Sequence, residues 1–196
     1  MKIDSENIFV AQGDFKDCEE YKIICQELRD AINAVSWYDP NKFIIKPDRK
    51  ANGVVPIKKN FVQYLLAKGW IAEQKMSVVD GIQPGPIDVI KITPRGIFAV
   101  EWETGNVSSS HRALNKIAVG IIQKAIIGGI LILPKKNLAQ YLTDRIGNYE
   151  EIAPYEPLYR NVIVENGLMG VFAIDYDGIS NLAPLIPKGN DGNAKK

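Results

Sequence analysis

Three acidic residues stand close together in a stretch of the chain that is otherwise apolar. Asp88 follows Pro86 and Ile87, and Glu101 and Glu103 flank Trp102 thirteen residues further along. Side chains alternate along a β-strand, so Glu101 and Glu103 share one face. Carboxylate oxygens are the ligands that hard divalent cations prefer. The pattern D-x12-E-x-E therefore fits a metal-dependent site, and the alternative is a set of solvated carboxylates on an exposed sheet face.

A β-hairpin must position these carboxylates. Ile87–Thr93 and Ile97–Glu103 are β-rich, and Thr93-Pro94-Arg95-Gly96 between them predicts a turn. A two- or four-residue loop pairs residues whose numbers sum to 189, which puts Asp88 opposite Glu101. A type I turn followed by a glycine bulge would shift the pairing by one and separate them. In the first register the like charges repel each other unless a cation lies between them.

Other chemistries fit the sequence less well. There is no P-loop and no glycine-rich dinucleotide turn. A zinc site needs several Cys or His ligands, and the chain has only Cys18, Cys25 and His111. His111 follows Ser108–Ser110 directly, so these residues cannot converge as a triad, and a structural or phosphate-facing histidine is favoured. A glycosidase with two carboxylates would leave the basic segment described below without a purpose.

The remaining periodicity predicts an α/β fold, with a central mixed β-sheet flanked by helices on both sides. One domain spans residues 1–196, and residues 184–196 form a C-terminal arm. Ser108–Ser110 are expected to cap the third helix. The predicted helices cover Phe15–Val35, 56–68, His111–Lys124 and Lys135–Ile146, and the further strands cover Ile130–Leu133 and Leu168–Ile174.

Charge is distributed unevenly along the 196 residues, whose net charge is +1. Residues 105–147 hold six basic side chains and one acidic one, a net +5 that fits either a polyanionic partner or a solvated surface. Two cysteines, expected as buried free thiols, indicate a reducing compartment. The start of the chain lacks a secretory signal, and its apolar runs are too short for a membrane span. We therefore expect a cytoplasmic protein without a membrane partner.

Several strings of residues resemble the BamHI family of type II restriction endonucleases. The similarity runs in order from about Asn52 to Gly192, and it is more specific than the acidic pattern alone. The strings are Asn52-Gly-Val-Val-Pro-Ile-Lys58, Gly85-Pro-Ile-Asp88-Val89, Glu101-x-Glu-Thr-Gly-Asn106-x-Ser108-Ser-x-His-Arg112-x-x-Asn-Lys116, Tyr141-Leu-Thr-Asp144-Arg145 and Pro184-Leu-Ile-Pro-Lys188-Gly-x-Asp-Gly192.

The resemblance implies a PD-(D/E)xK nuclease core and a homodimer that acts on double-stranded DNA. It implies Mg²⁺-dependent hydrolysis of phosphodiester bonds at a palindromic six-base-pair site, GGATCC, with 5′ overhangs. Mn²⁺ should substitute for Mg²⁺, and Ca²⁺ should bind without supporting cleavage; no small-molecule cofactor is expected. The alternative is a catalytically silent or non-restriction DNA-binding protein on the same core.

The same resemblance assigns residues. Glu103 takes the place of the usual lysine and accepts a proton from the attacking water or orients that water. Asp88, Glu101 and Glu73 act with it in catalysis and bind metal, together with the backbone carbonyl of Trp102. The implied DNA contacts, for which Arg, Asp and Asn have suitable hydrogen-bonding groups, are Asn106, Ser108, Arg112, Asp144 and Arg145 toward bases, and Lys58, Lys116 and Lys188 toward the backbone.

Overall fold

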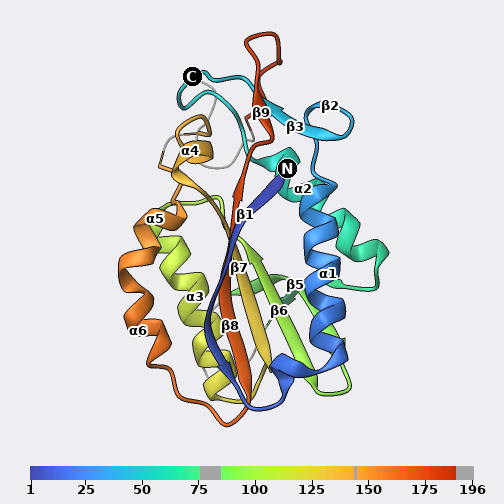
Figure 1. The fold of residues 1–196 in the computed structure, drawn as a ribbon, viewed down its shortest axis with the longest axis vertical. Coiled ribbons are helices and arrows are strands. Elements are labelled where there is room, and N and C mark those ends of the chain that lie inside the picture. The colour runs from blue at the N-terminus through green and yellow to red at the C-terminus, as the bar shows by residue number, and fades with distance from the viewer. Residues whose placement is uncertain (76–84, 144, 189–196) are drawn as a thin grey trace.

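A mixed sheet forms the centre of the molecule. The computed structural model describes residues 1–75, 85–143 and 145–188, and within them the main sheet has the strand order β1-β8-β7-β6-β5-β4 (Figure 1). β6, β7 and β8 are parallel, whereas the other neighbours pair in antiparallel fashion. The predicted mixed sheet is confirmed. The strands are β1 (Lys2–Gln12), β4 (Ile71–Lys75), β5 (Pro86–Thr93), β6 (Gly96–Trp102), β7 (Gly128–Pro134) and β8 (Gly167–Asp175).

Both faces of this sheet are buried under helices, as predicted. Successive side chains of a strand point to opposite faces, and in β7 Ile130 and Ile132 belong to one core while Leu131 and Leu133 belong to the other. The first core includes α1 and α2, and the second includes α3, α5 and α6 (Figure 1). These helices are α1 (Glu19–Asn33), α2 (Val55–Ala67), α3 (Val107–Ile122), α5 (Tyr149–Ile152) and α6 (Glu156–Arg160).

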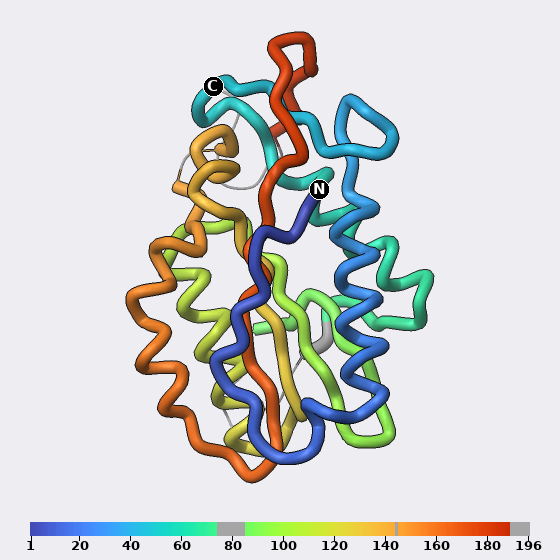
Figure 2. The backbone as a smooth tube through the Cα atoms, viewed as in Figure 1, coloured from blue at the N-terminus to red at the C-terminus, as the bar shows by residue number. Residues whose placement is uncertain are grey.

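A small second sheet lies at one end of the molecule. It contains β2 (Tyr38–Asp39), β3 (Lys42–Ile45) and β9 (Gly178–Ile179), in the order β2-β3-β9. Figure 2 shows that the chain after β3 and the last described residues run beside each other at this end. Backbone hydrogen bonds extend the pairing at this end, for example from Ser180 N, directly after β9, to Ile45 O of β3 at 3.0 Å.

The described part of the predicted C-terminal arm, Pro184–Lys188, is docked against the body of the protein. Gly53 N donates to Ile186 O at 2.8 Å, and Ile186 is buried. Gly53 has no room for a side chain, because a Cβ atom there would lie 1.9 Å from the Pro187 carbonyl oxygen. Residues 189–196 lie outside the described residues.

Most of the predicted elements are present. α2 matches the helix predicted over 56–68, and Gly69, with φ +80°, follows it as expected for a helix stop. α1 occupies most of Phe15–Val35 after a short 3-10 turn at Phe15–Asp17. The predicted strands 130–133 and 168–174 lie within β7 and β8. Among the described residues, no helix combines the length and the apolar character needed to cross a bilayer.

The predicted helix over Lys135–Ile146 is wrong. Among the residues of this range that the structure describes, only α4 (Lys136–Ala139) is helical. The carbonyl oxygens of Gln140 and Tyr141 accept hydrogen bonds from the backbone amides of Lys50 and Asn52, each at 3.0 Å. These carbonyls are thus occupied by donors about ninety residues away in the chain, and local periodicity cannot reveal such pairing.

The two cysteines are free thiols, as expected, but they differ in burial. Cys25 is buried inside α1, whereas Cys18 is only partly buried at the residue before the helix. Burial raises the pKa of the Cys25 thiol. A protonated, inaccessible thiol is a poor nucleophile, so Cys25 is a packing residue.

Candidate active site

The hairpin of β5 and β6 has the register that brings the carboxylates together. Thr93 pairs with Gly96, and the pairing continues without a bulge to Val89 and Val100, so paired numbers sum to 189. A two-residue loop of Pro94 and Arg95 closes the hairpin. Gly96 has φ +137°, which an L side chain rarely adopts. The shifted register is therefore excluded.

Asp88 and Glu101 meet at the point where the regular pairing of β5 and β6 stops. The backbone amide of Asp88 points to Glu101 Oε2 at 3.4 Å, and the backbone amide of Trp102 donates to Asp88 Oδ2 at 2.8 Å. Each carboxylate thus contacts the opposite strand. Glu101 is 6% exposed, so a negative charge there is poorly solvated.

Burial raises the pKa of Glu101 above its ordinary value, and the nearby carboxylate of Asp88 raises the pKa further. Lys116 opposes both effects, because its ammonium group is ion-paired with Glu101 Oε1. A buried carboxylate of this kind gains strongly from a neighbouring cation.

Two lysines supply that positive charge from opposite faces of the sheet. Lys116, on α3, contacts Glu101 and also donates to Pro86 O at 2.8 Å. Lys58, on α2, donates to Asp88 Oδ1 at 2.6 Å. Lys116 is buried and lines the cavity beside these carboxylates, and its expected contact with the DNA backbone remains a prediction. Lys116 lies four residues after Arg112, so both are on one face of the helix. Because Arg112 is a predicted base contact, this spacing could have indicated that Lys116 lies at the site.

Glu103 follows β6 directly. Its backbone amide donates to Ile132 O of β7 at 3.1 Å, which extends the sheet by one residue. Its side-chain Oε1 accepts a hydrogen bond from the backbone amide of Gly105 at 2.6 Å. The carboxylate is therefore held by the turn that leads from β6 into α3.

All three acidic groups face one cavity of about 340 Å³. Its charged lining consists of three carboxylates and three cationic side chains: Asp88, Glu101, Glu103, Lys58, Arg112 and Lys116. The donor set fits a hard cation, because oxygen ligands predominate and the two facing carboxylates already attract ammonium groups. Among the described residues, however, no three acidic, histidine or cysteine side chains are close enough to hold an ion.

Glu73 is not brought into this cluster. β4 pairs Ala72 with Val89 and Gln74 with Ile87, which leaves Glu73 opposite Asp88. Its φ of +51° is in the left-handed region, and its side chain is exposed. It does not line the cavity. The left-handed backbone takes the side chain out of the regular alternation of the strand, whereas the assignment of Glu73 depends on the family resemblance alone.

Trp102 lies beneath the site. Its ring is buried and packs on Phe61, with ring centroids 4.6 Å apart. Its backbone amide is committed to Asp88. The role of its carbonyl as a metal ligand remains a prediction.

Three of the predicted base contacts, Asn106, Ser108 and Arg112, lie at the start of α3. Asn106 caps this helix, since its side-chain oxygen accepts from Ser109 N at 3.1 Å. The helix begins at Val107, so the prediction that Ser108–Ser110 cap a helix from about His111 is wrong: these serines form its first turns. Ser108 and Arg112 are exposed, as is Asn106, and the positive end of the helix dipole lies beside them.

Arg145 reaches the same region from another segment. It is exposed and has φ +68°. Two residues later, Gly147 N donates to Gly105 O at 2.8 Å, which joins this segment to the residue before Asn106. Asp144 lies outside the described residues. Lys188 lies elsewhere and donates to Lys50 O at 3.1 Å.

His111 has a structural environment, which is one of the two alternatives expected for it. Its Nδ1 lies 3.0 Å from the hydroxyl of Tyr159, and its ring meets Tyr155 edge to face with centroids 4.5 Å apart. These contacts fix α3 against the segment that carries α6.

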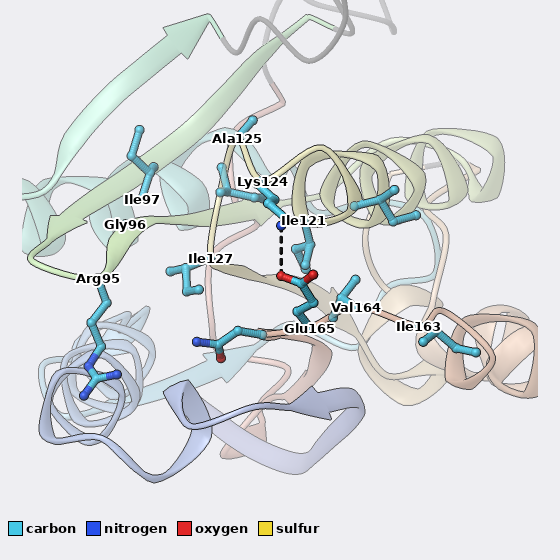
Figure 3. A pocket seen from close by; sticks show the side chains of 13 residues that line it. Arg95, Gly96, Ile97, Ile121, Lys124, Ala125, Ile127, Ile163, Val164 and Glu165 are labelled. Atoms are coloured by element: carbon cyan, nitrogen blue, oxygen red, sulfur yellow. Dashed lines mark hydrogen bonds and ion pairs between the residues drawn. The ribbon is translucent and has the colours of Figure 1, made fainter.

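A second cavity, of about 400 Å³, lies at the other end of β6. Figure 3 shows apolar side chains such as Ile121, Ile127 and Val164 around it, with the ion pair of Lys124 and Glu165 among them. The acidic residue that lines this second cavity is Glu165, and its charge is neutralised by the ion pair with Lys124. The paired carboxylates that could support hydrolytic chemistry line the first cavity.

A mixed sheet with helices on both faces, whose antiparallel hairpin presents facing carboxylates, gives the chain a restriction-endonuclease-like fold. The restriction endonuclease BglII, solved in complex with a DNA 16-mer, has this fold: it superposes with a TM-score of 0.60 at 12% identity, covering 90% of this chain and 79% of that one.

The chain belongs to the family of restriction endonuclease BamHI, whose family model matches residues 1–193. It is 44% identical over 173 residues to the type II restriction enzyme OkrAI of Oceanobacter kriegii, covering 88% of this chain and 89% of OkrAI. It is 34% identical over 181 residues to the type II restriction enzyme BamHI of Bacillus amyloliquefaciens, covering 87% of this chain and 82% of BamHI.

Proposed function

We propose that this protein is a Mg²⁺-dependent homodimeric endonuclease that cuts double-stranded DNA at the palindrome GGATCC and leaves 5′ overhangs. The observation that carries the proposal is the contact between Asp88 and Glu101 across β5 and β6, at a cavity that Glu103 also lines. The two relatives named above are both type II restriction enzymes.

Asp88 and Glu101 are the residues that would hold Mg²⁺. The ion would supply positive charge to the phosphate oxygens and lower the pKa of the attacking water. The ammonium groups of Lys58 and Lys116 contact one oxygen of each carboxylate, so a bound ion would compete with them for these oxygens, and displaced ammonium groups would add positive charge beside the phosphate. Mn²⁺ should substitute for Mg²⁺, whereas Ca²⁺ should bind without supporting cleavage.

Glu103 is the residue that would accept the proton of the attacking water. It lines the cavity and is half-buried. Lysine at this position would bring a positive charge, whereas a carboxylate can act as a base. Glu103 brings no positive charge to the site, and the ammonium groups of Lys58 and Lys116 would supply that charge.

Sequence recognition falls to the exposed groups at the start of α3 and at Arg145. An arginine fork suits the O6 and N7 atoms of guanine, and a side-chain amide suits adenine. Asp144, which accepts from cytosine in this assignment, completes the set. A two-fold symmetric dimer matches the two-fold symmetry of a palindrome, so each subunit would cut one strand.

Digestion of a plasmid of known sequence tests the proposal. With Mg²⁺, wild-type protein should give discrete fragments whose mapped ends fall within GGATCC; with Ca²⁺ it should bind the same site without cutting. Fragments ending at another sequence would refute the site, and random degradation would refute specificity. Specific binding without cleavage in Mg²⁺ would identify a DNA-binding protein that lacks catalysis.

Glu103→Ala should keep specific DNA binding in Ca²⁺ and lose cleavage in Mg²⁺, with a rate loss on the order of 10²- to 10⁴-fold. Gel-shift titration and single-turnover cleavage on the same duplex measure the two properties separately. Wild-type cleavage by this variant would rule out the role of Glu103.

A further inference from the structure

Gly105 lies in the short turn between Glu103, which is the proposed base, and Asn106, which caps α3. Its amide hydrogen-bonds to Glu103 Oε1 at 2.6 Å. Its carbonyl accepts from the amide of Gly147 at 2.8 Å. One peptide segment thus contacts the proposed base on one side and the segment that follows Arg145 on the other.

A side chain at position 105 would displace the Glu103 carboxylate from its present place. A Cβ atom there would lie 2.8 Å from Glu103 Oε1 and 3.1 Å from Ser109 Oγ. The φ angle of Gly105 is not in the left-handed region, so alanine would be compatible with the backbone. The constraint therefore comes from the neighbouring carboxylate and the first turns of α3.

Gly147 is equally confined. Its Cβ atom would lie 2.9 Å from Ser110 Oγ and 3.0 Å from the backbone nitrogen of Val107. The chain after Arg145 is therefore packed directly on the N-terminus of α3. A shift of either proposed DNA-contacting segment would be passed to the Gly105 peptide, because both are bonded to it or adjacent in the chain.

We propose that Gly105, held by Gly147, is a positioning residue that sets the carboxylate of Glu103 and links it to the segments carrying Asn106 and Arg145. The stabilising contact itself is independent of DNA. Its consequence for cleavage rests on the proposed function.

A stability cycle tests the contact without DNA or metal. Unfolding is measured for wild type, Gly105→Ala, Glu103→Ala and the double variant. Gly105→Ala should lower the melting temperature in the wild-type background and lower it clearly less in the Glu103→Ala background, because the clash with Oε1 is then removed. Equal shifts in both backgrounds would overturn the proposed contact. Gly178→Ala is the matched control, since a Cβ there would meet only the end of Ile44, at 3.0 Å.

Cleavage tests the link. Gly105→Ala should slow single-turnover cleavage of the cognate duplex on the order of 10- to 100-fold, the cost of a small misplacement of a reacting group, while its affinity for that duplex in Ca²⁺ stays within about twofold. Glu103→Asp should reduce the additional loss caused by Gly105→Ala, because the shorter side chain withdraws from the added methyl group. Gly147→Ala should also slow cleavage.

An unchanged cleavage rate in folded Gly105→Ala, or a loss fully explained by weaker DNA binding, would overturn the link. If the wild-type protein cuts no DNA, the proposed function fails, and the stability cycle still decides whether Gly105 positions Glu103.

Discussion

Lys116 places a positive charge beside Glu101 where both side chains are 8% exposed. Removing one partner of a buried ion pair leaves an uncompensated charge, which costs about 3–5 kcal/mol. Lys116→Met should therefore lower the free energy of unfolding by that amount in metal-free buffer, as measured by urea denaturation. Adding Glu101→Gln should restore most of the loss. A double variant as unstable as the single one would contradict the pairing.

The same substitution at an exposed pair provides the control. Lys124 and Glu165 form an ion pair whose side chains are 74% and 83% exposed. Exposed pairs of this kind contribute little, because water screens them. Lys124→Met should leave the denaturation midpoint unchanged.

Asp175 predicts a pH-dependent stability. Burial raises its pKa, although the Tyr176 amide offsets part of this effect. With the folded pKa above the unfolded one, the favourable contribution of the carboxyl is present at low pH and is lost as pH rises through the folded pKa. Asp175→Asn should therefore exceed wild type in stability at neutral pH, and the gain should shrink toward about pH 4.

Urea denaturation at several pH values measures this gain, and a gain independent of pH would contradict it. Asp14→Asn should show the opposite sign, because a hydrogen bond from Arg95 lowers the pKa of Asp14. That variant should be less stable than wild type at neutral pH and approach it in acid.

At the scale of elements, Asn106 has two roles at the N-terminus of α3: it caps the helix, and in the proposed function it contacts a DNA base. Replacing an N-cap asparagine with alanine costs about 1 kcal/mol. Asn106→Ala should lose that stability, whereas Asn106→Asp should keep it, because a carboxylate can also accept from Ser109 N. If the side-chain amide also donates to a base, Asn106→Asp should still weaken specific binding. Full retention of cognate affinity by stable Asn106→Asp would contradict the recognition role.

The hairpin was predictable because its information is local. The turn Thr93-Pro94-Arg95-Gly96 predicted the hairpin but left two registers open, and the structure has the register that brings Asp88 beside Glu101. The strands β1 and β4 were not predicted. β1 is half polar and pairs with β8, more than 150 residues away. β1 forms by pairing with β8, and the local sequence of β1 carries no information about that distant strand.

The site was predictable only in part, because local sequence brings some of its residues together and tertiary packing brings the others. Asp88, Glu101 and Glu103 converge through one hairpin and the residue after it. Lys58 and Lys116 arrive from helices on opposite faces of the sheet, so only tertiary packing reveals that they meet the carboxylates. Spacing in the sequence cannot reveal that Glu73 adopts a left-handed backbone and stays outside the cluster.

At the scale of the whole molecule, one side exposes apolar groups that a second copy could cover. Leu158 on α6 is 66% exposed, Ile163 just after it is 85% exposed, and Ile122 at the end of α3 is 49% exposed. Ile122 and Ile163 line the same cavity, so these helix ends are neighbours. Exposed apolar clusters of this kind mark association surfaces.

If the proposed homodimer uses this side, a charge there should separate the subunits. Leu158→Glu combined with Ile163→Glu would bury four carboxylates in a two-fold interface, at a cost that opposes association. Sedimentation should show a monomer where wild type is a dimer. A monomer carries one carboxylate-lined cavity and can cut only one DNA strand at a time. Plasmid cleavage should therefore become slow and yield nicked circles. Leu182→Glu, at a residue 81% exposed, is the control and should remain dimeric. A dimeric double variant that makes double-strand breaks at the wild-type rate would show that the subunits meet through another surface.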